Sequence, residues 1–93
     1  MITTIIAMTL ALSSLGYSQP QIQCAANLVQ KESNFNPAAF NKKSGAAGMY
    51  QILGLKLPMS IDKQTIRFDK YIKSRYNGDM CKAWKHFQTN RWY

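Results

Sequence analysis

The chain has 93 residues, which is enough for one domain and close to the size at which a hydrophobic core alone rarely suffices. Its 12 basic and 4 acidic residues give a net charge of +8. Such a surface attracts polyanions, namely nucleic acid, anionic lipid or a bacterial wall with its acidic polymers. Two cysteines cannot form a structural zinc site, and the single histidine does not complete one, so no metal or cofactor is expected.

Residues 1–18 carry no charged side chain, and two interpretations of this segment stay open. The stretch from Ile5 to Leu12 has the length of the apolar region of a signal peptide and is too short for a stable membrane span. Cleavage between Ser18 and Gln19 would follow a small-x-small pattern. The alternative is a first helix, although its Thr and Ser residues do not gather on one face. We favour the export signal, with the folded domain spanning 19–93.

A helix is predicted between two prolines, since Pro20 suits a first turn and Pro37 stops a helix. Glu32 falls in its last turn and continues an apolar stripe, which consists of Ile22, Ala25, Leu28 and Val29. Loss of hydration and the negative pole of the helix both disfavour the charged carboxylate, so we expect a raised pKa. The alternative is a solvated glutamate paired with Lys31 or Lys42.

The remainder of the chain is predicted to be helical apart from one loop. Residues 44–57 form this loop with a short helical turn, where Gly45 and Gly48 permit a close approach of the backbone to a ligand. Ser60 caps the next helix, which ends at 77–78 and buries Ile61, Phe68, Ile72 and Tyr76. Asp79 caps the last helix. No β-rich run or repeat is present, so the fold class is all-α, with at most a few extended residues near a cleft.

Several motifs in the first half resemble the lytic transglycosylase domain of the soluble-lytic-transglycosylase type. This domain belongs to the lysozyme-like superfamily and cleaves peptidoglycan. The motifs are Glu32-Ser33, Asn36-Pro37, Ala39-Phe40-Asn41 and the stretch from Ser44 to Gln51, SGAAGMYQ. The resemblance implies a compact lysozyme-like single domain.

The second half is similar to small, cysteine-bearing members of the family, which occur in secreted bacterial proteins and phage particles. The matching stretches are Gln23-Cys24, 71–78 (YIKSRYNG), 81–86 (CKAWKH) and 91–93 (RWY), so the resemblance covers about residues 16–93. Arg91 departs from the usual glycine. The sequence AWKHF at 83–87 replaces the Ala-Tyr-Asn-Ala-Gly of larger members, so the tyrosine that holds the glutamate there has no assigned equivalent.

From the residues alone, Cys24 and Cys81 are either a disulfide or two buried thiols. The resemblance favours a disulfide between the two helices that carry them. A crosslink at this separation stabilises a fold by roughly 4 kcal/mol.

The resemblance implies cleavage of the β-1,4 bond between N-acetylmuramic acid and N-acetylglucosamine, which leaves 1,6-anhydro ends. It assigns Glu32 as the single catalytic acid and base. The other three acidic residues, Asp62, Asp69 and Asp79, look like helix-cap or helix-face residues. Substrate contacts are expected from Ser33, Gln51, Tyr50, Met49 and Trp84. We expect His86 at the surface, and Trp92 and Tyr93 packed onto the body.

The expected partners are peptidoglycan glycan strands and, in addition, virion or secretion-apparatus proteins; nucleic acid is not expected. The protein would be secreted or periplasmic, or carried in a virion if phage-encoded. Two alternatives stay open. One is a lysozyme-like module that binds peptidoglycan without cleaving it, and the other is a cationic secreted protein that acts through charge alone.

Overall fold

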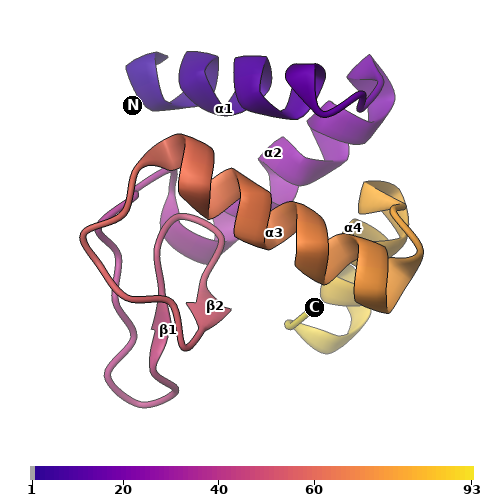
Figure 1. Cartoon of the computed structure of the whole chain (residues 1–93). Helices are drawn as coiled ribbons and strands as arrows, with labels where there is room; N and C mark the ends of the chain where they lie inside the picture. Colours follow the sequence, from indigo (N-terminus) through magenta and orange to yellow (C-terminus); the bar gives the residue numbers. More distant parts are fainter. Residues whose placement is uncertain (1) are drawn as a thin grey trace.

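The computed structural model describes residues 2–93, which contain four helices and one short β-hairpin (Figure 1). The helices are α1 (Ile2–Ser14), α2 (Gln19–Ser33), α3 (Ile61–Tyr76) and α4 (Met80–Asn90), and the strands are β1 (Ala46–Ala47) and β2 (Ile52–Leu53). The strands are antiparallel, with Ala46 opposite Leu53 and Ala47 opposite Ile52. The all-α prediction is confirmed, and the few extended residues lie in the loop where the sequence allows them.

Local sequence signals set the ends of the helices. Pro20 lies in the first turn of α2, and Asn34 ends that helix in a left-handed conformation with its N–H bonded to the Gln30 oxygen. Ser60 caps α3 by accepting a hydrogen bond from the N–H of Lys63. Asp79 caps α4 by accepting from two N–H groups of its first turn. These caps satisfy backbone groups that have no partner within a helix.

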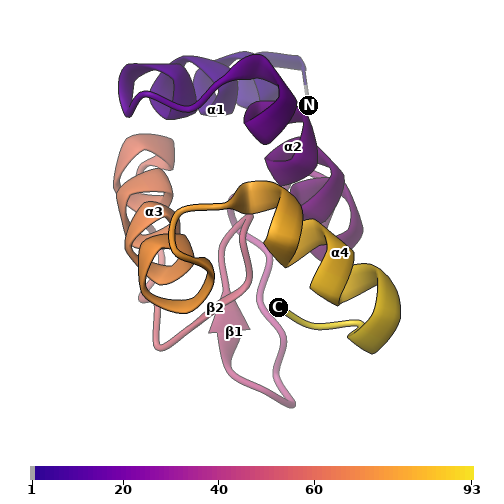
Figure 2. The ribbon, with the colours of Figure 1, turned by 90° about the vertical axis from the view of Figure 1, so that its right-hand side faces the viewer.

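The core lies between the four helices and the loop that carries the hairpin. In Figures 1 and 2, α1 lies across α3 and the start of α2, whereas the hairpin lies below them beside the C-terminus. Every helix contributes fully buried side chains, which include Met8, Leu12, Ala25, Val29, Phe68, Ile72, Met80 and Ala83. The predicted apolar stripe of α2 is therefore the face that packs against the rest of the domain.

A disulfide joins the starts of α2 and α4, as the resemblance implies. Cys24 and Cys81 are bonded, with their Cα atoms 5.1 Å apart, across a sequence separation of 57 residues. Beside this bond, Gln21 donates to the Asp79 carboxylate at 3.0 Å and accepts from the N–H of Met80. The helix that carries Glu32 is thus fastened to the last helix by a covalent bond and by side-chain hydrogen bonds.

The N-terminal segment is helical and packed in this structure. Met8 and Leu12 of α1 are fully buried, and the Tyr17 hydroxyl after the helix donates to the buried Asp69 carboxylate. This is the packing that the first-helix interpretation requires, while the export signal stays a prediction. Within residues 2–93, the helices fall short of the length and apolar character needed to cross a membrane.

Candidate functional site

Glu32 lies in the last turn of α2, where its side chain is only partly exposed. Burial raises the pKa of its carboxyl from 4.5 to about 7. The cause is the one expected from the sequence, because a carboxylate at the end of an apolar stripe loses hydration. At neutral pH the group is present in both protonation states, which is the condition for giving and taking a proton.

The loop opposite Glu32 is fixed by hydrogen bonds to the main chain of Met49. The Ser33 hydroxyl donates to the Met49 oxygen at 2.7 Å. On the other side, Gln64 accepts from the Met49 N–H at 2.9 Å. The buried Gln64 amide also donates to the oxygens of Pro37 and Met59, at 3.0 and 2.9 Å. The loop is therefore tied both to the end of α2 and to α3.

Gly48 permits this arrangement because no side chain fits there. A Cβ atom at Gly48 would lie 2.4 Å from Oε1 of Gln64 and 2.8 Å from a methyl group of Leu55, and the backbone has φ +83°. The sequence predicted a close backbone approach to a ligand at Gly45 and Gly48, whereas the group that approaches Gly48 is Gln64 of the protein itself and a Cβ at Gly45 would meet nothing within 4 Å. Sequence analysis missed Gln64, although its polar side chain falls between Ile61 and Phe68 on the apolar face of α3.

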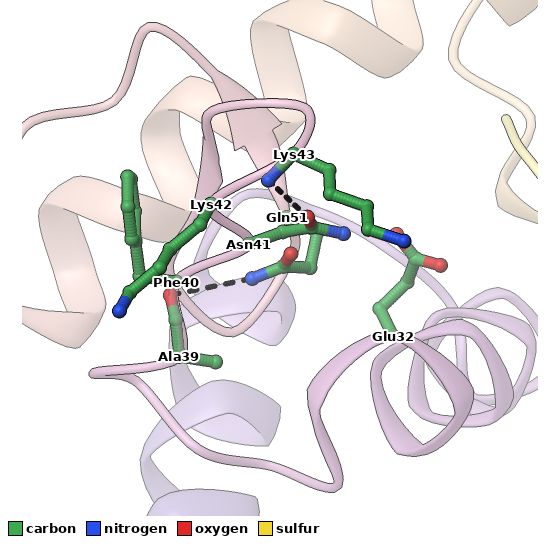
Figure 3. A pocket seen from close by; sticks show the side chains of 7 residues that line it. All are labelled: Glu32, Ala39, Phe40, Asn41, Lys42, Lys43 and Gln51. Carbon is green, nitrogen blue, oxygen red and sulfur yellow. Dashed lines mark hydrogen bonds between the residues drawn. The ribbon is translucent and has the colours of Figure 1, made fainter.

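Gln51 lies in the turn between β1 and β2 and lines the space in front of Glu32. Its backbone is left-handed, with φ 54°. Its amide nitrogen donates back into the loop, to the oxygen of Gly48 at 2.9 Å. It also donates to the oxygen of Ala39 at 3.3 Å, the bond drawn in Figure 3. The side chain is therefore held by its own loop at the edge of the space in front of Glu32.

Two hollows meet at Glu32. The first, called here the lysine hollow, has a volume of about 430 Å³ and is shown in Figure 3. Its lining consists of Glu32, Ala39, Phe40, Asn41, Lys42, Lys43 and Gln51. In the figure the side chain of Lys43 reaches across the hollow toward the carboxylate. This side of Glu32 is open, polar and basic.

The second hollow, called here the tryptophan hollow, has a volume of about 470 Å³. It shares Glu32, Asn41 and Gln51 with the lysine hollow, and its other lining residues are Ser44, Ala46, Ile52, Leu53, Tyr71, Arg91, Trp92 and Tyr93. The hairpin, α3 and the C-terminal segment thus form one wall of the tryptophan hollow. Since three residues line both hollows, the two adjoin at the glutamate and are together called the cleft here.

Of the four acidic residues in the chain, only Glu32 lines these two hollows. Asp79 caps α4, and Asp69 is buried, where it accepts from Tyr17 and pairs with Lys73 at 3.1 Å. Asp62 lies in the first turn of α3. The linings of the two hollows therefore contain one acidic side chain.

Tyr93 is buried and lines the tryptophan hollow together with Glu32. Its hydroxyl donates to the main-chain oxygen of Tyr50, and its own main-chain oxygen accepts from the hydroxyls of Tyr71 and Tyr76. Burial and, to a smaller extent, the charge of Glu32 raise the pKa of the Tyr93 hydroxyl. The structure thus places a buried tyrosine in the lining of the same hollow as Glu32, where the sequence assigned none.

The other predicted substrate contacts fall elsewhere. Met49 and Tyr50 are buried in the core, with exposed fractions of 0% and 1%, and they line neither of these hollows. Trp84 stacks on Phe87 with ring centroids 6.0 Å apart, away from both hollows. Tyr93 is buried in the body, as expected. Trp92 also packs onto the body, against Arg75 and His86, but it stays 52% exposed and lines the tryptophan hollow.

Comparison with known families gives one result for this chain. Residues 17–80 match the family model of the transglycosylase SLT domain. The match includes α2 with Glu32, the loop that contains Gln51 and all of α3, whereas α4 after its first residue and the C-terminal segment lie beyond it. No curated protein and no solved structure matches the chain.

Proposed function

The chain belongs to the transglycosylase SLT-domain family, and from this premise we propose that it is a peptidoglycan lytic transglycosylase. Its substrate is the β-1,4 bond between N-acetylmuramic acid and N-acetylglucosamine, and its product carries a 1,6-anhydro end. One observation carries the proposal: Glu32, with a pKa of about 7, is the single acid at the junction of the two hollows.

A single carboxyl group can perform both proton transfers of this reaction. Protonated Glu32 donates its proton to the glycosidic oxygen as the bond from that oxygen to C1 of the muramoyl residue breaks. The carboxylate that remains then accepts the proton of the C6 hydroxyl of the same sugar. The C6 oxygen attacks C1 and closes the anhydro ring, and Glu32 is again protonated.

The intramolecular nucleophile explains why one acid suffices. Hydrolysis of glycosides commonly uses a second carboxylate, either to activate water or to form a covalent intermediate. Here the attacking hydroxyl belongs to the substrate and is already close to C1, so orientation replaces the activation of water. The absence of another acid from the lining of the two hollows supports this route over hydrolysis.

The two hollows allow a glycan strand to lie on both sides of the bond that breaks. The bond is held at Glu32, with one sugar in the lysine hollow and the other in the tryptophan hollow. Lys42 and Lys43 on one side and Arg91 on the other add positive charge near the acidic peptides of the wall. Gln51, fixed at the border of the two hollows, is positioned to contact a sugar amide.

This activity takes place outside the cytoplasm. The bond between Cys24 and Cys81 is of a kind that persists in oxidising compartments, and peptidoglycan lies in such a compartment. The protein would reach it by secretion or, if phage-encoded, as part of a virion.

Incubation of the oxidised protein with purified peptidoglycan tests the proposal, with the soluble products identified by mass spectrometry. The parent protein should release muropeptides with 1,6-anhydro ends, and Glu32→Gln should lower the rate on the order of 10³-fold. Reducing-end products would show that water is the nucleophile. Binding of the wall by both proteins without products from either would instead establish a non-catalytic module.

A further inference from the structure

Trp92 is a large aromatic side chain that is 52% exposed, and it lies at the wall of the tryptophan hollow. A single exposed aromatic residue needs no explanation by itself. This one differs because it is held by contacts from two helices and lies in the same hollow as Glu32.

The ring of Trp92 is held by Arg75 of α3 and His86 of α4. The guanidinium carbon of Arg75 lies 4.6 Å from the centre of the Trp92 ring, a cation–π contact. The His86 ring lies 4.4 Å away at an interplanar angle of 72°. Nδ1 of His86 is also 2.9 Å from the Trp92 main-chain oxygen. Both the side chain and the backbone of Trp92 are therefore fixed.

The next residue anchors the segment to the core. Tyr93 is bonded through its hydroxyl to the main chain of Tyr50 and through its main-chain oxygen to Tyr71 and Tyr76. Its ring packs edge-on against Phe68, with centroids 5.9 Å apart. Because Trp92 is held in place before a ligand arrives, binding costs little further ordering of this side chain.

The neighbours of Trp92 in the hollow show which ligand suits it. Ile52, Leu53 and Tyr71 provide apolar surface, while Asn41, Gln51, Ser44 and Arg91 provide hydrogen-bonding groups. A pyranose ring has the matching chemistry, since it has an apolar C–H face and a rim of hydroxyl and amide groups. Mixed linings of this kind, apolar with a few polar groups, are typical of small-ligand sites.

We propose that Trp92 is the platform on which one sugar ring of the glycan strand stacks, in the subsite that adjoins the bond cleaved at Glu32. This inference rests on the proposed function and adds the residue that binds the substrate on one side of the bond. It assigns the role to Trp92 in place of Trp84, which stacks on Phe87 outside both hollows.

Fluorescence can test the platform, because the chain has two tryptophans and each can be observed alone. Glu32→Gln serves as the background, so that the ligand is not cleaved. Trp84→Phe in this background leaves Trp92 as the only tryptophan, and Trp92→Phe leaves Trp84. The probe is soluble glycan strands released from peptidoglycan by an amidase. We expect the strands to shift Trp92 emission to the blue and to lower its quenching by acrylamide about two-fold or more, without changing Trp84.

Affinity for the same strands provides a second measurement. In the Glu32→Gln background, Trp92→Ala should weaken binding on the order of ten-fold, and Trp92→Phe should retain most of the affinity because a flat ring remains. Since the Trp92 side chain is half exposed, both variants should keep a melting temperature close to that of the background protein, which shows that they fold.

The outcomes separate this inference from the proposed function. Strands that bind without changing Trp92 emission or quenching, and with equal affinity for Trp92→Ala, would overturn the platform while cleavage by the parent protein still stands. If the strands bind none of the variants and the parent protein releases no anhydro products, both proposals fall.

Discussion

The two hollows beside Glu32 are built in different ways. Apart from Glu32 and Gln51, the lysine hollow is lined by one contiguous stretch, residues 39–43, which follows α2 closely in the chain. The tryptophan hollow combines the hairpin, Tyr71 of α3 and residues 91–93 of the C-terminal segment. One side of the cleft thus depends on local turns, and the other depends on contacts between distant parts of the chain. Substitutions should therefore affect the two sides separately, except where a residue serves both.

The disulfide supports the side built from distant parts, because it fastens α2 to the helix that leads to the C-terminal segment. Replacing both cysteines, Cys24→Ser with Cys81→Ser, should lower the free energy of unfolding by about 4 kcal/mol, the loop-closure value for a bond of this sequence separation. Urea denaturation of the oxidised parent and the double variant measures the difference. A parent protein treated with reductant is the matched control and should give the same loss. Equal urea midpoints for all three would contradict this prediction.

The protonation state of Glu32 affects both sides of the cleft equally, because Glu32 lines both hollows. The reaction begins with the protonated acid, so kcat/KM should fall as pH rises through the pKa of about 7. At pH 9 about 1% of the group is protonated, which predicts a rate about 100-fold below that at pH 5 to 6. No second carboxylate lines the two hollows, so no rate loss from protonation of a catalytic base is expected on the acid side. A bell-shaped profile would reveal a base that the structure does not identify.

Tyr93 lines the tryptophan hollow, and its hydroxyl donates to the main-chain oxygen of Tyr50 in the core. Tyr93→Phe leaves the Tyr50 oxygen without its buried donor, and we expect a loss of about 1 to 2 kcal/mol in unfolding free energy. Tyr71→Phe is the matched control, because Tyr76 continues to donate to the same Tyr93 oxygen. The loss of unfolding free energy should therefore be smaller for Tyr71→Phe than for Tyr93→Phe. A larger loss for Tyr71→Phe than for Tyr93→Phe, measured by thermal denaturation, would reverse the roles given to the two hydroxyls.

The raised pKa of Glu32 also has a cost in stability. Between pH 4.5 and about 7 the folded protein holds a proton that the unfolded chain has released, so this contribution to stability declines as pH rises through that window. Glu32→Gln removes the buried charge. It should stabilise the protein at pH 8 by about 1 kcal/mol, after discounting for the partial exposure of the group, and by little at pH 4. Melting temperatures at the two pH values test this, with the exposed Asp62→Asn as a control for loss of charge.

The features that the sequence predicted correctly are local or belong to a family motif. Pro20, Ser60 and Asp79 mark helix ends through groups in the next turn, and the helical period alone places Glu32 at the end of a buried stripe. The disulfide followed from resemblance, because two cysteines by themselves leave the choice between a bond and free thiols open.

The features that the sequence did not predict are contacts between distant residues. Tyr93 meets Tyr50 across 43 positions, and Gln64 meets Met49 across 15, with no repeating pattern to pair them. Trp92 and Trp84 differ in exposure because of how the chain turns after α4, where Arg91 has φ 65°. Aromatic character alone therefore could not distinguish the tryptophan that lines a hollow from the one that stacks on Phe87. The lysine hollow, being local, was largely contained in the motif that runs from Glu32 to Gln51.

Charge on the lysine hollow should have the smallest effect, and one that depends on salt. Lys42 and Lys43 are exposed, so solvent and ions screen their attraction for the acidic peptides of the wall. Lys42→Gln with Lys43→Gln should weaken binding to peptidoglycan about two- to three-fold at low salt and leave it unchanged near 0.5 M salt, where the Debye length is only a few ångströms. Lys82→Gln with Lys85→Gln, on α4 and outside both hollows, is the charge-matched control. An equal effect of the two pairs would mean that the net charge of the protein attracts the wall. Weaker binding for the Lys42 and Lys43 pair alone would show that the lysine hollow attracts the glycan strand through charge, whereas the tryptophan hollow binds it through the shape of its lining.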